Sequence, residues 1–168
     1  RDTDRSRGLG DVYKRQEAVN QALIEGAVGG IVATDCKIGR SRYWAANATV
    51  PVNEISFRIV MTNVSSKPVT LSGDNFATTL DGTPIPPFNF SARDVGDADI
   101  WRTYDSLTIR PGEERSVALA YEISQPTYDS WYRSSRTVAV SFTCGNQRVT
   151  YTKNSRSDEI TVSDIETL

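Results

Sequence analysis

The side chains of this sequence offer little for catalysis. The 168 residues include no histidine, which removes the usual general base and the Ser-His-Asp and Cys-His arrangements, together with most zinc and copper sites. Two carboxylates across a cleft could still hydrolyse a glycoside. The candidate acids fall at expected strand ends and turns, where carboxylates are usually solvated: Glu54, Asp81, Glu113 and Glu114. We therefore expect a protein that is not an enzyme and uses no cofactor.

Three aspartates in the segment DVGDAD are the best candidates for a metal site. Asp94, Asp97 and Asp99 alternate around a glycine, and such a loop can surround an oxygen-preferring ion such as Ca²⁺. The spacing matches no complete calcium-loop pattern. A solvated turn is the alternative.

Aromatic side chains in the second half of the chain are candidates for ligand binding. They are Trp101, Tyr104, Tyr128, Trp131 and Tyr132. Three of them fall in the segment YDSWY, which we expect to be a loop between two core strands. Exposed rings can stack on sugars or anchor a protein interface, so the expected partner is a glycan or a protein. Alternatively, Trp101 and Trp131 fold back over the ends of the core.

Cys36 and Cys144 are the two cysteines, and each lies on the apolar side of an expected strand. A disulfide between them would close a loop that the chain-entropy model values at about 5 kcal/mol, and it would place the protein in an oxidising compartment. Two reduced, buried thiols are the alternative.

The elements that must position these residues are strands. Apolar residues alternate with more polar ones in three segments, which predicts strands with one buried face. The apolar sets are Ile55, Phe57, Ile59 and Met61; Val117, Leu119, Tyr121 and Ile123; and Val138, Val140, Phe142 and Cys144. Helical crossovers are missing after Gly30, which excludes a parallel sheet.

Turn residues separate these segments at the spacing typical of a sandwich. Asp81-Gly82 and Gly145-Asn146 favour two-residue hairpins, and Gly112 follows Pro111 in a turn that needs a positive φ. The fold class predicted is an all-β, immunoglobulin-like antiparallel β-sandwich of seven to nine strands with a short N-terminal helix.

The ends of the chain differ from this central region. Residues 11–16, DVYKRQ, resemble a translated sequencing adapter, so we set residues 1–16 apart as an artefact. Residues 17–29 have helix-forming character that glycines interrupt, and residues 30–153 form the sandwich. Residues 154–168 are a polar, acidic tail or an edge strand.

Charge and hydropathy limit the partners. The net charge of −2 becomes −4 without residues 1–16, and no basic stripe exists for phosphate contacts, so we expect no nucleic-acid partner. No apolar stretch is long enough for a transmembrane segment. A signal peptide or lipid anchor could have been lost with the true N-terminus.

Two segments resemble a known family. Residues 61–82, MTNVSSKPVTLSGDNFATTLDG, and residues 107–123, LTIRPGEERSVALAYEI, are similar to the immunoglobulin-like domain of unknown function in bacterial lipoproteins and secreted proteins. That group is similar in fold to the mycobacterial immunoprotective extracellular protein. The resemblance implies an extracytoplasmic binding or structural module without family-wide catalytic residues. A carbohydrate-binding module and a virion or appendage structural domain are the alternatives.

Overall fold

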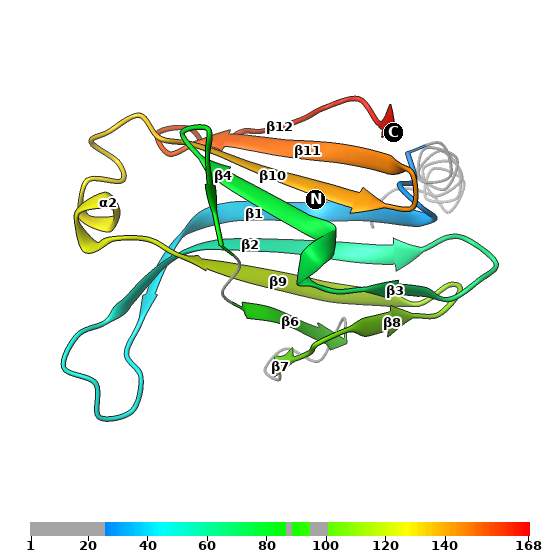
Figure 1. Cartoon of the computed structure of the whole chain (residues 1–168), viewed down its shortest axis with the longest axis horizontal. Coiled ribbons are helices and arrows are strands. Elements are labelled where there is room, and N and C mark those ends of the chain that lie inside the picture. The colour runs from blue at the N-terminus through cyan, green and yellow to red at the C-terminus, as the bar shows by residue number, and fades with distance from the viewer. Residues whose placement is uncertain (1–25, 87–88, 95–100) are drawn as a thin grey trace, which may run out of the picture.

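The computed structural model describes residues 26–86, 89–94 and 101–168, which form two antiparallel sheets stacked face to face (Figure 1). The five-stranded sheet runs in the order β1 (Ile31–Tyr43), β2 (Val52–Asn63), β9 (Glu114–Glu122), β6 (Asn89–Asp94) and β7 (Arg102–Thr103). The six-stranded sheet runs in the order β12 (Ile160–Val162), β11 (Gln147–Asn154), β10 (Thr137–Cys144), β4 (Phe76–Leu80) and β5 (Thr83–Ile85), and β13 (Glu166–Thr167) also pairs with β11. A ribbon of β3 (Val69–Leu71) and β8 (Leu107–Ile109) completes the β-structure. The predicted all-β antiparallel sandwich is confirmed.

The structure has more strands than predicted, because many of them are very short. Thirteen strands occur in the described ranges, but only seven of them have five or more residues. The remaining strands have two or three residues, too few for an alternating pattern to be visible in the sequence. The predicted seven to nine strands therefore correspond to the long ones.

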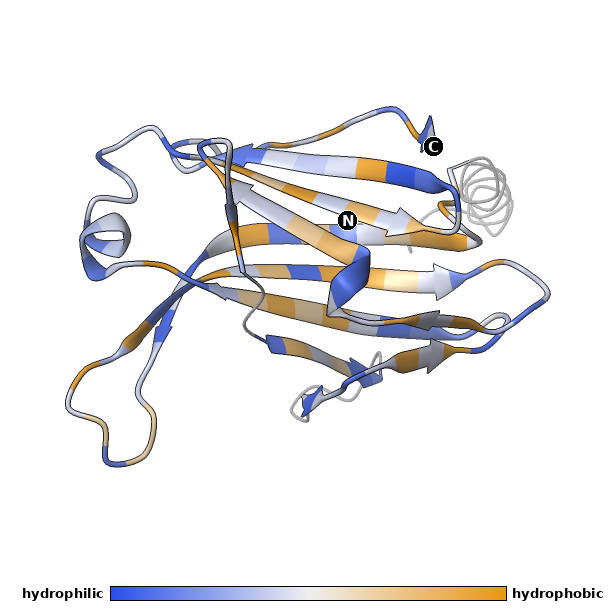
Figure 2. Cartoon of the chain, viewed as in Figure 1, coloured by the Kyte–Doolittle hydropathy of each residue, from blue (hydrophilic) through white to orange (hydrophobic). Residues whose placement is uncertain are grey.

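Alternating apolar side chains build the core, as their period predicts (Figure 2). Phe57 lies at its centre, with its ring centroid 6.0 Å from that of Phe76 and 5.9 Å from that of Tyr151. Those two rings belong to the opposite sheet, so Phe57 joins the two layers. All three predicted apolar sets are buried: Ile55, Phe57, Ile59, Met61, Val117, Leu119, Tyr121, Ile123, Val138, Val140, Phe142 and Cys144.

The predicted turns are confirmed by their backbone angles. Asp81 and Gly82 have φ values of 52° and 83° between the paired residues Leu80 and Thr83, the condition for a primed two-residue turn. Gly112 has φ 80°, and the Glu113 amide donates to the Arg110 carbonyl at 2.9 Å.

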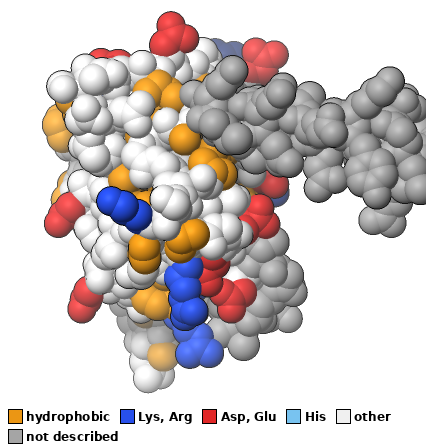
Figure 3. Space-filling model, turned by 90° about the vertical axis from the view of Figure 1, so that its right-hand side faces the viewer, with side chains coloured by type: hydrophobic (Ala, Val, Ile, Leu, Met, Phe, Trp, Pro, Cys, Tyr) orange, Lys and Arg blue, Asp and Glu red, His pale blue; other side chains and the backbone are white. Residues whose placement is uncertain are grey.

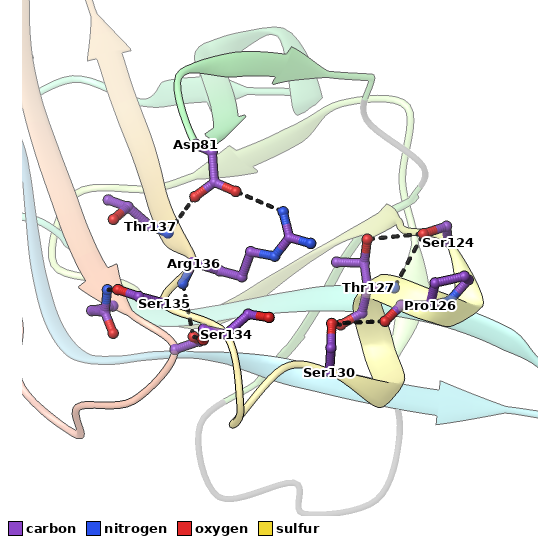
Figure 4. Close-up of polar contacts among 11 residues, drawn as sticks. Asp81, Ser124, Pro126, Thr127, Ser130, Ser134, Ser135, Arg136 and Thr137 are labelled. Carbon is purple, nitrogen blue, oxygen red and sulfur yellow. Dashed lines mark hydrogen bonds and ion pairs between the residues drawn. The ribbon is translucent and has the colours of Figure 1, made fainter.

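Asp81 also fastens its hairpin to the neighbouring strand (Figure 4). Its carboxylate accepts hydrogen bonds from the Thr137 amide at 2.8 Å and from the Arg136 guanidinium at 2.9 Å. The bond from Thr137, followed by that from Arg136, lowers the pKa of Asp81. The turn between β4 and β5 is therefore held at the start of β10.

A one-turn helix, α2 (Gln125–Asp129), stands where a plain loop is predicted. Ser124 caps it, because its hydroxyl oxygen accepts from the Thr127 amide at 3.2 Å (Figure 4). Pro126 lies in the first turn, where a missing N–H costs nothing. A serine followed closely by proline is a recognisable helix start.

The two ends of the chain are described unequally. Residues 1–16, and most of the helix predicted over 17–29, lie outside the described residues, while Gly26–Gly29 form turns and a single bridge. After Asn154, the strands β12 and β13 pair with β11. Within the described ranges, no helix has the length and apolar content to cross a bilayer.

The predicted disulfide is wrong, because Cys36 and Cys144 are both free. Cys144 ends β10, and its thiol lies 3.8 Å from the Gly29 carbonyl oxygen. Burial, and secondly the charge of Cys36, raise the pKa of Tyr151 to about 12, so Cys36 lies near Tyr151, which pairs with Val140. Cys36 thus lies near the level of Val140, which is four residues, or about 13 Å of strand, from Cys144. A disulfide needs Cα atoms within about 7 Å.

Candidate functional site

The five aromatic candidates do not form one site. Trp131 is 1% exposed and belongs to the core, so for this residue the alternative of a core-covering ring holds. Tyr104 is half-buried, and its hydroxyl accepts from Arg115 at 3.3 Å. Tyr128 and Tyr132 lie in and just after α2, beside β1. Only Trp101 lies over the outer face of the five-stranded sheet.

Trp101 is bracketed by two arginines from different strands. The guanidinium carbon of Arg58 lies 5.4 Å from the centre of the Trp101 ring, and that of Arg93 lies 5.0 Å from it. Both distances are within the range of a cation–π interaction. The indole therefore holds two like charges near each other on one surface.

Strand register explains why these two arginines meet. Arg58 on β2 pairs with Ala118 on β9, and Arg93 on β6 pairs with Ser116 on the other side of β9. Each of the four alternates along its strand with core residues, so all four lie on the outer side of the sheet, where Ser116 is itself buried. The arginines thus rise on either side of a strand whose outward residues are small.

A cleft of about 400 Å³ lies among these side chains. Its lining includes Lys37 as well as the two arginines and Trp101. A smaller hollow of about 120 Å³ follows β9 toward Glu54. The second hollow adds hydroxyl and amide groups from Ser56, Asn89 and Ser91.

A β-bulge brings further charges to the cleft. The register between β1 and β2 shifts by one residue between Thr34 and Lys37, and Asp35 takes a φ of 50°. The extra residue changes which side chains face outward, so Asp35 and Lys37 both line the cleft. The described part of the lining thus carries three cations and one carboxylate.

Glu54 is the acid of the smaller hollow. Its carboxylate accepts from the Ser41 hydroxyl at 2.9 Å. Burial raises the pKa of Glu54, while the Ser41 hydrogen bond and the charge of Arg58 lower it in part. Glu54 is therefore a weaker acid than an exposed glutamate.

Sequence reasoning missed Lys37, Arg58 and Arg93. One sequence feature could have indicated Arg58, because it stands at a polar position of a clearly alternating strand. The small residues Ser116 and Ala118 occupy polar positions of another such strand. Their grouping depends on the order of β2, β9 and β6, which local sequence does not contain.

The aspartate candidates are only partly described. Asp94 forms an ion pair with Arg115 at 3.0 Å, while Asp97 and Asp99 lie outside the described residues. Among the residues that the structure does describe, no three His, Cys, Asp or Glu side chains are grouped to hold a metal ion.

An apolar groove of about 230 Å³ lies between the start of β1 and the β11–β12 edge. Figure 3 shows the end of the molecule at the right of Figure 1, where hydrophobic side chains reach the surface close to lysine or arginine side chains. The groove is lined by Gly26, Val28, Ile31, Ala33, Phe142, Val149, Tyr151, Val162, Ser163 and Ile165. None of these described lining residues is charged, in contrast to the cleft beside Trp101.

Comparison with known proteins gives similarity of fold only. No family model matches the chain, and no curated protein matches it. Among solved structures, the yjhA protein from Bacillus subtilis is 15% identical, with a TM-score of 0.42 and coverage of 67% of this chain and 73% of that one. A candidate lipoprotein (ycdA) from Bacillus subtilis is 9% identical, with a TM-score of 0.47 and coverage of 78% and 38%.

A third solved structure is an uncharacterized β-sandwich protein from Clostridium difficile 630. It is 14% identical, with a TM-score of 0.43 and coverage of 77% of this chain and 91% of that one. None of the three TM-scores reaches 0.5, so no property of those proteins is transferred to this chain.

Proposed function

We propose that the chain is a non-catalytic, extracytoplasmic binding module and that the cleft beside Trp101 is its ligand surface. The ligand that we propose is an anionic glycan. This is a more specific form of the carbohydrate-binding module that the sequence suggests as an alternative. The observation that carries the proposal is the pair of guanidiniums held 5.4 Å and 5.0 Å from one indole ring.

Electrostatics favours an anion in this cleft. Arg58, Arg93 and Lys37 line it, and Asp35 is the one acid among the described residues of the lining. Guanidinium groups bind carboxylate, sulfate and phosphate through paired hydrogen bonds.

The remaining lining favours a sugar over an apolar ligand. The hydroxyls of Ser56 and Ser91 and the amide of Asn89 lie along the adjoining hollow, where sugar hydroxyls could exchange hydrogen bonds with them. The cleft and the hollow share Arg58 and Trp101 and so follow one another along the sheet, which suits an extended polymer. The resemblance to immunoglobulin-like domains of bacterial lipoproteins and secreted proteins supports an extracytoplasmic location.

Affinity electrophoresis tests this proposal. Gels contain polygalacturonate as the carboxylate probe, teichoic acid as the phosphate probe, or dextran as a neutral control. We expect retardation by at least one anionic polymer, none by dextran, and weaker retardation as salt rises. The double variant Arg58→Gln/Arg93→Gln should bind at least about tenfold more weakly.

Arg156→Gln is the matched control, because Arg156 is exposed in the turn after β11, and it should bind like the original chain. Circular dichroism verifies that each variant is folded. Equal loss in the control, or no retardation by either anionic polymer, would contradict the proposal. A structural role as a spacer domain would then be the better interpretation.

A further inference from the structure

The hairpin between β1 and β2 extends beyond the rest of the sandwich as an arm (Figure 1). We call residues 43–53 the arm tip. Tyr43, Trp44 and Val50 are 40%, 61% and 67% exposed, and they are three of the seven exposed large hydrophobic side chains in the described part of the chain. Exposed apolar surface is therefore concentrated at one projecting point.

The arm tip has no charged residue. Its sequence is YWAANATVPVN, and every residue from Arg42 to Val50 is exposed. In Figure 2 the projecting loop is largely pale to orange, whereas the strands behind it alternate with blue. The exposed end of the arm therefore presents no charge to its surroundings.

Two arginines form a basic collar behind the tip. The guanidinium carbons of Arg40 and Arg42 lie 4.2 Å and 4.0 Å from the centre of the Tyr128 ring. Arg40 also lies 4.6 Å from the centre of the exposed Tyr132 ring. The collar therefore combines cations with amphipathic aromatic rings.

The collar fixes the arm to the body of the protein. The Arg42 side chain donates to Asn53 at 2.7 Å across the hairpin and forms an ion pair with Asp129 of α2 at 3.2 Å. Arg40 donates to the Tyr128 carbonyl. The arm is thus braced by α2 and presents its tip in a defined direction.

We propose that the arm tip inserts into the interfacial layer of a lipid bilayer. Tryptophan and tyrosine favour this layer because one part of each ring is apolar and another is polar. The collar would then lie at the level of the lipid phosphates, where arginine is attracted to anionic headgroups. Because the tip is a loop whose amides need polar partners, it would stop short of the hydrocarbon core.

The separation of charge along the arm favours lipid over a protein partner. The uncharged residues are farthest from the body. The charged groups lie behind them, with Arg42 and Arg40 on β1, Glu54 on β2 and Asp129 paired with Arg42, so an apolar end precedes a charged layer, as in a bilayer interface. A flat surface could also reach the projecting tip without contact with the sheets (Figure 1). This inference does not depend on the proposed glycan cleft.

Vesicle flotation with the full chain tests the inference. Vesicles of phosphatidylcholine mixed with phosphatidylglycerol carry bromine on their acyl chains near the headgroups, so that they quench a nearby tryptophan. Trp131 is buried and Trp101 lies on the sheet, which leaves Trp44 as the residue to be quenched. We expect the protein to float with the vesicles and its fluorescence to fall.

Trp44→Ala should remove the quenching and lower the bound fraction at least about fivefold, and Val50→Ser should also weaken binding. Val64→Ser is the control, because Val64 is an exposed valine just after the other end of β2, and it should bind and be quenched like the original chain. Absence of flotation, or flotation that Trp44→Ala leaves unchanged, would overturn the inference. Both arm residues are exposed, so these variants are expected to fold.

Discussion

Glu54 shows how the outer face changes the chemistry of a single side chain. It is half-buried and stands directly opposite Glu122 on the neighbouring strand. Burial raises its pKa above the ordinary value for a glutamate. A folded-state pKa above the unfolded-state value means that the ionised carboxylate opposes folding.

Replacement of this acid should therefore stabilise the protein at neutral pH. Glu54→Gln keeps an oxygen that can accept from Ser41 and removes the charge. We expect a gain of less than about 1 kcal/mol in the free energy of unfolding near pH 7. The gain should shrink as pH falls, because protonated Glu54 no longer opposes folding. Urea unfolding at several pH values measures this difference.

Glu159→Gln provides the control for that comparison, since Glu159 is an exposed carboxylate just before β12 of the six-stranded sheet. Its stability relative to the original chain should change little with pH. A Glu54→Gln difference that stays constant from acidic to neutral pH would mean that the effect does not arise from ionisation of Glu54.

Asn63 acts at the scale of whole elements. It is 0% exposed, and its amide nitrogen donates to the carbonyls of Lys67 and Ile109, both at 2.8 Å. Its side-chain oxygen accepts from the amide and hydroxyl of Ser65 at 2.9 and 2.7 Å. One side chain thus joins the end of β2, the turn that follows it and β8.

Loss of this amide should destabilise the fold strongly. Asn63→Ala removes the buried bond to the Ile109 carbonyl and one of the two donors to the Lys67 carbonyl, and we expect a loss of about 2–4 kcal/mol in the free energy of unfolding. Asn63→Asp should also be destabilising, because an ionised carboxylate cannot donate to Lys67 or Ile109. Denaturant titration gives both values.

Asn146→Ala tests whether asparagine in a turn matters in general. Asn146 is exposed in the β10–β11 turn, so its removal should change stability by no more than about 0.5 kcal/mol. A loss below about 1 kcal/mol for Asn63→Ala would show that the buried network is not needed to join these elements.

At the scale of the whole molecule, the sandwich is held together by packing without a covalent link between its sheets. Phe57, Phe76 and Tyr151 connect the layers through ring contacts, and the cysteines lie at different levels along the strands. Burial raises the pKa of Cys36 to about 12, so its reactive thiolate is suppressed in the folded state.

Thiol titration without reductant should therefore detect two thiols per denatured chain. In the folded protein, alkylation of Cys36 should be much slower, and a reducing agent should leave the thermal unfolding midpoint unchanged. Detection of fewer than two thiols in freshly purified, denatured protein would contradict this prediction and favour a bonded pair.

Alternation along single strands was readable from the sequence, because the period of two is a local property of extended backbone. It correctly identified the buried sets around Phe57, Leu119 and Val140 and the hairpin at Asp81-Gly82. The same local chemistry identified Trp101 as a candidate for binding, although it could not distinguish Trp101 from Trp131, which is buried.

The meeting of residues from different strands was decided only by the tertiary structure. A bulge of one residue in β1 changes which side chains face outward, and strand order places Arg58 and Arg93 on either side of β9. Pairing order and bulges depend on contacts between segments far apart in the chain, so no local pattern encodes them. The same physics separated Cys36 from Cys144, because two inward-facing side chains can lie at different heights in one core.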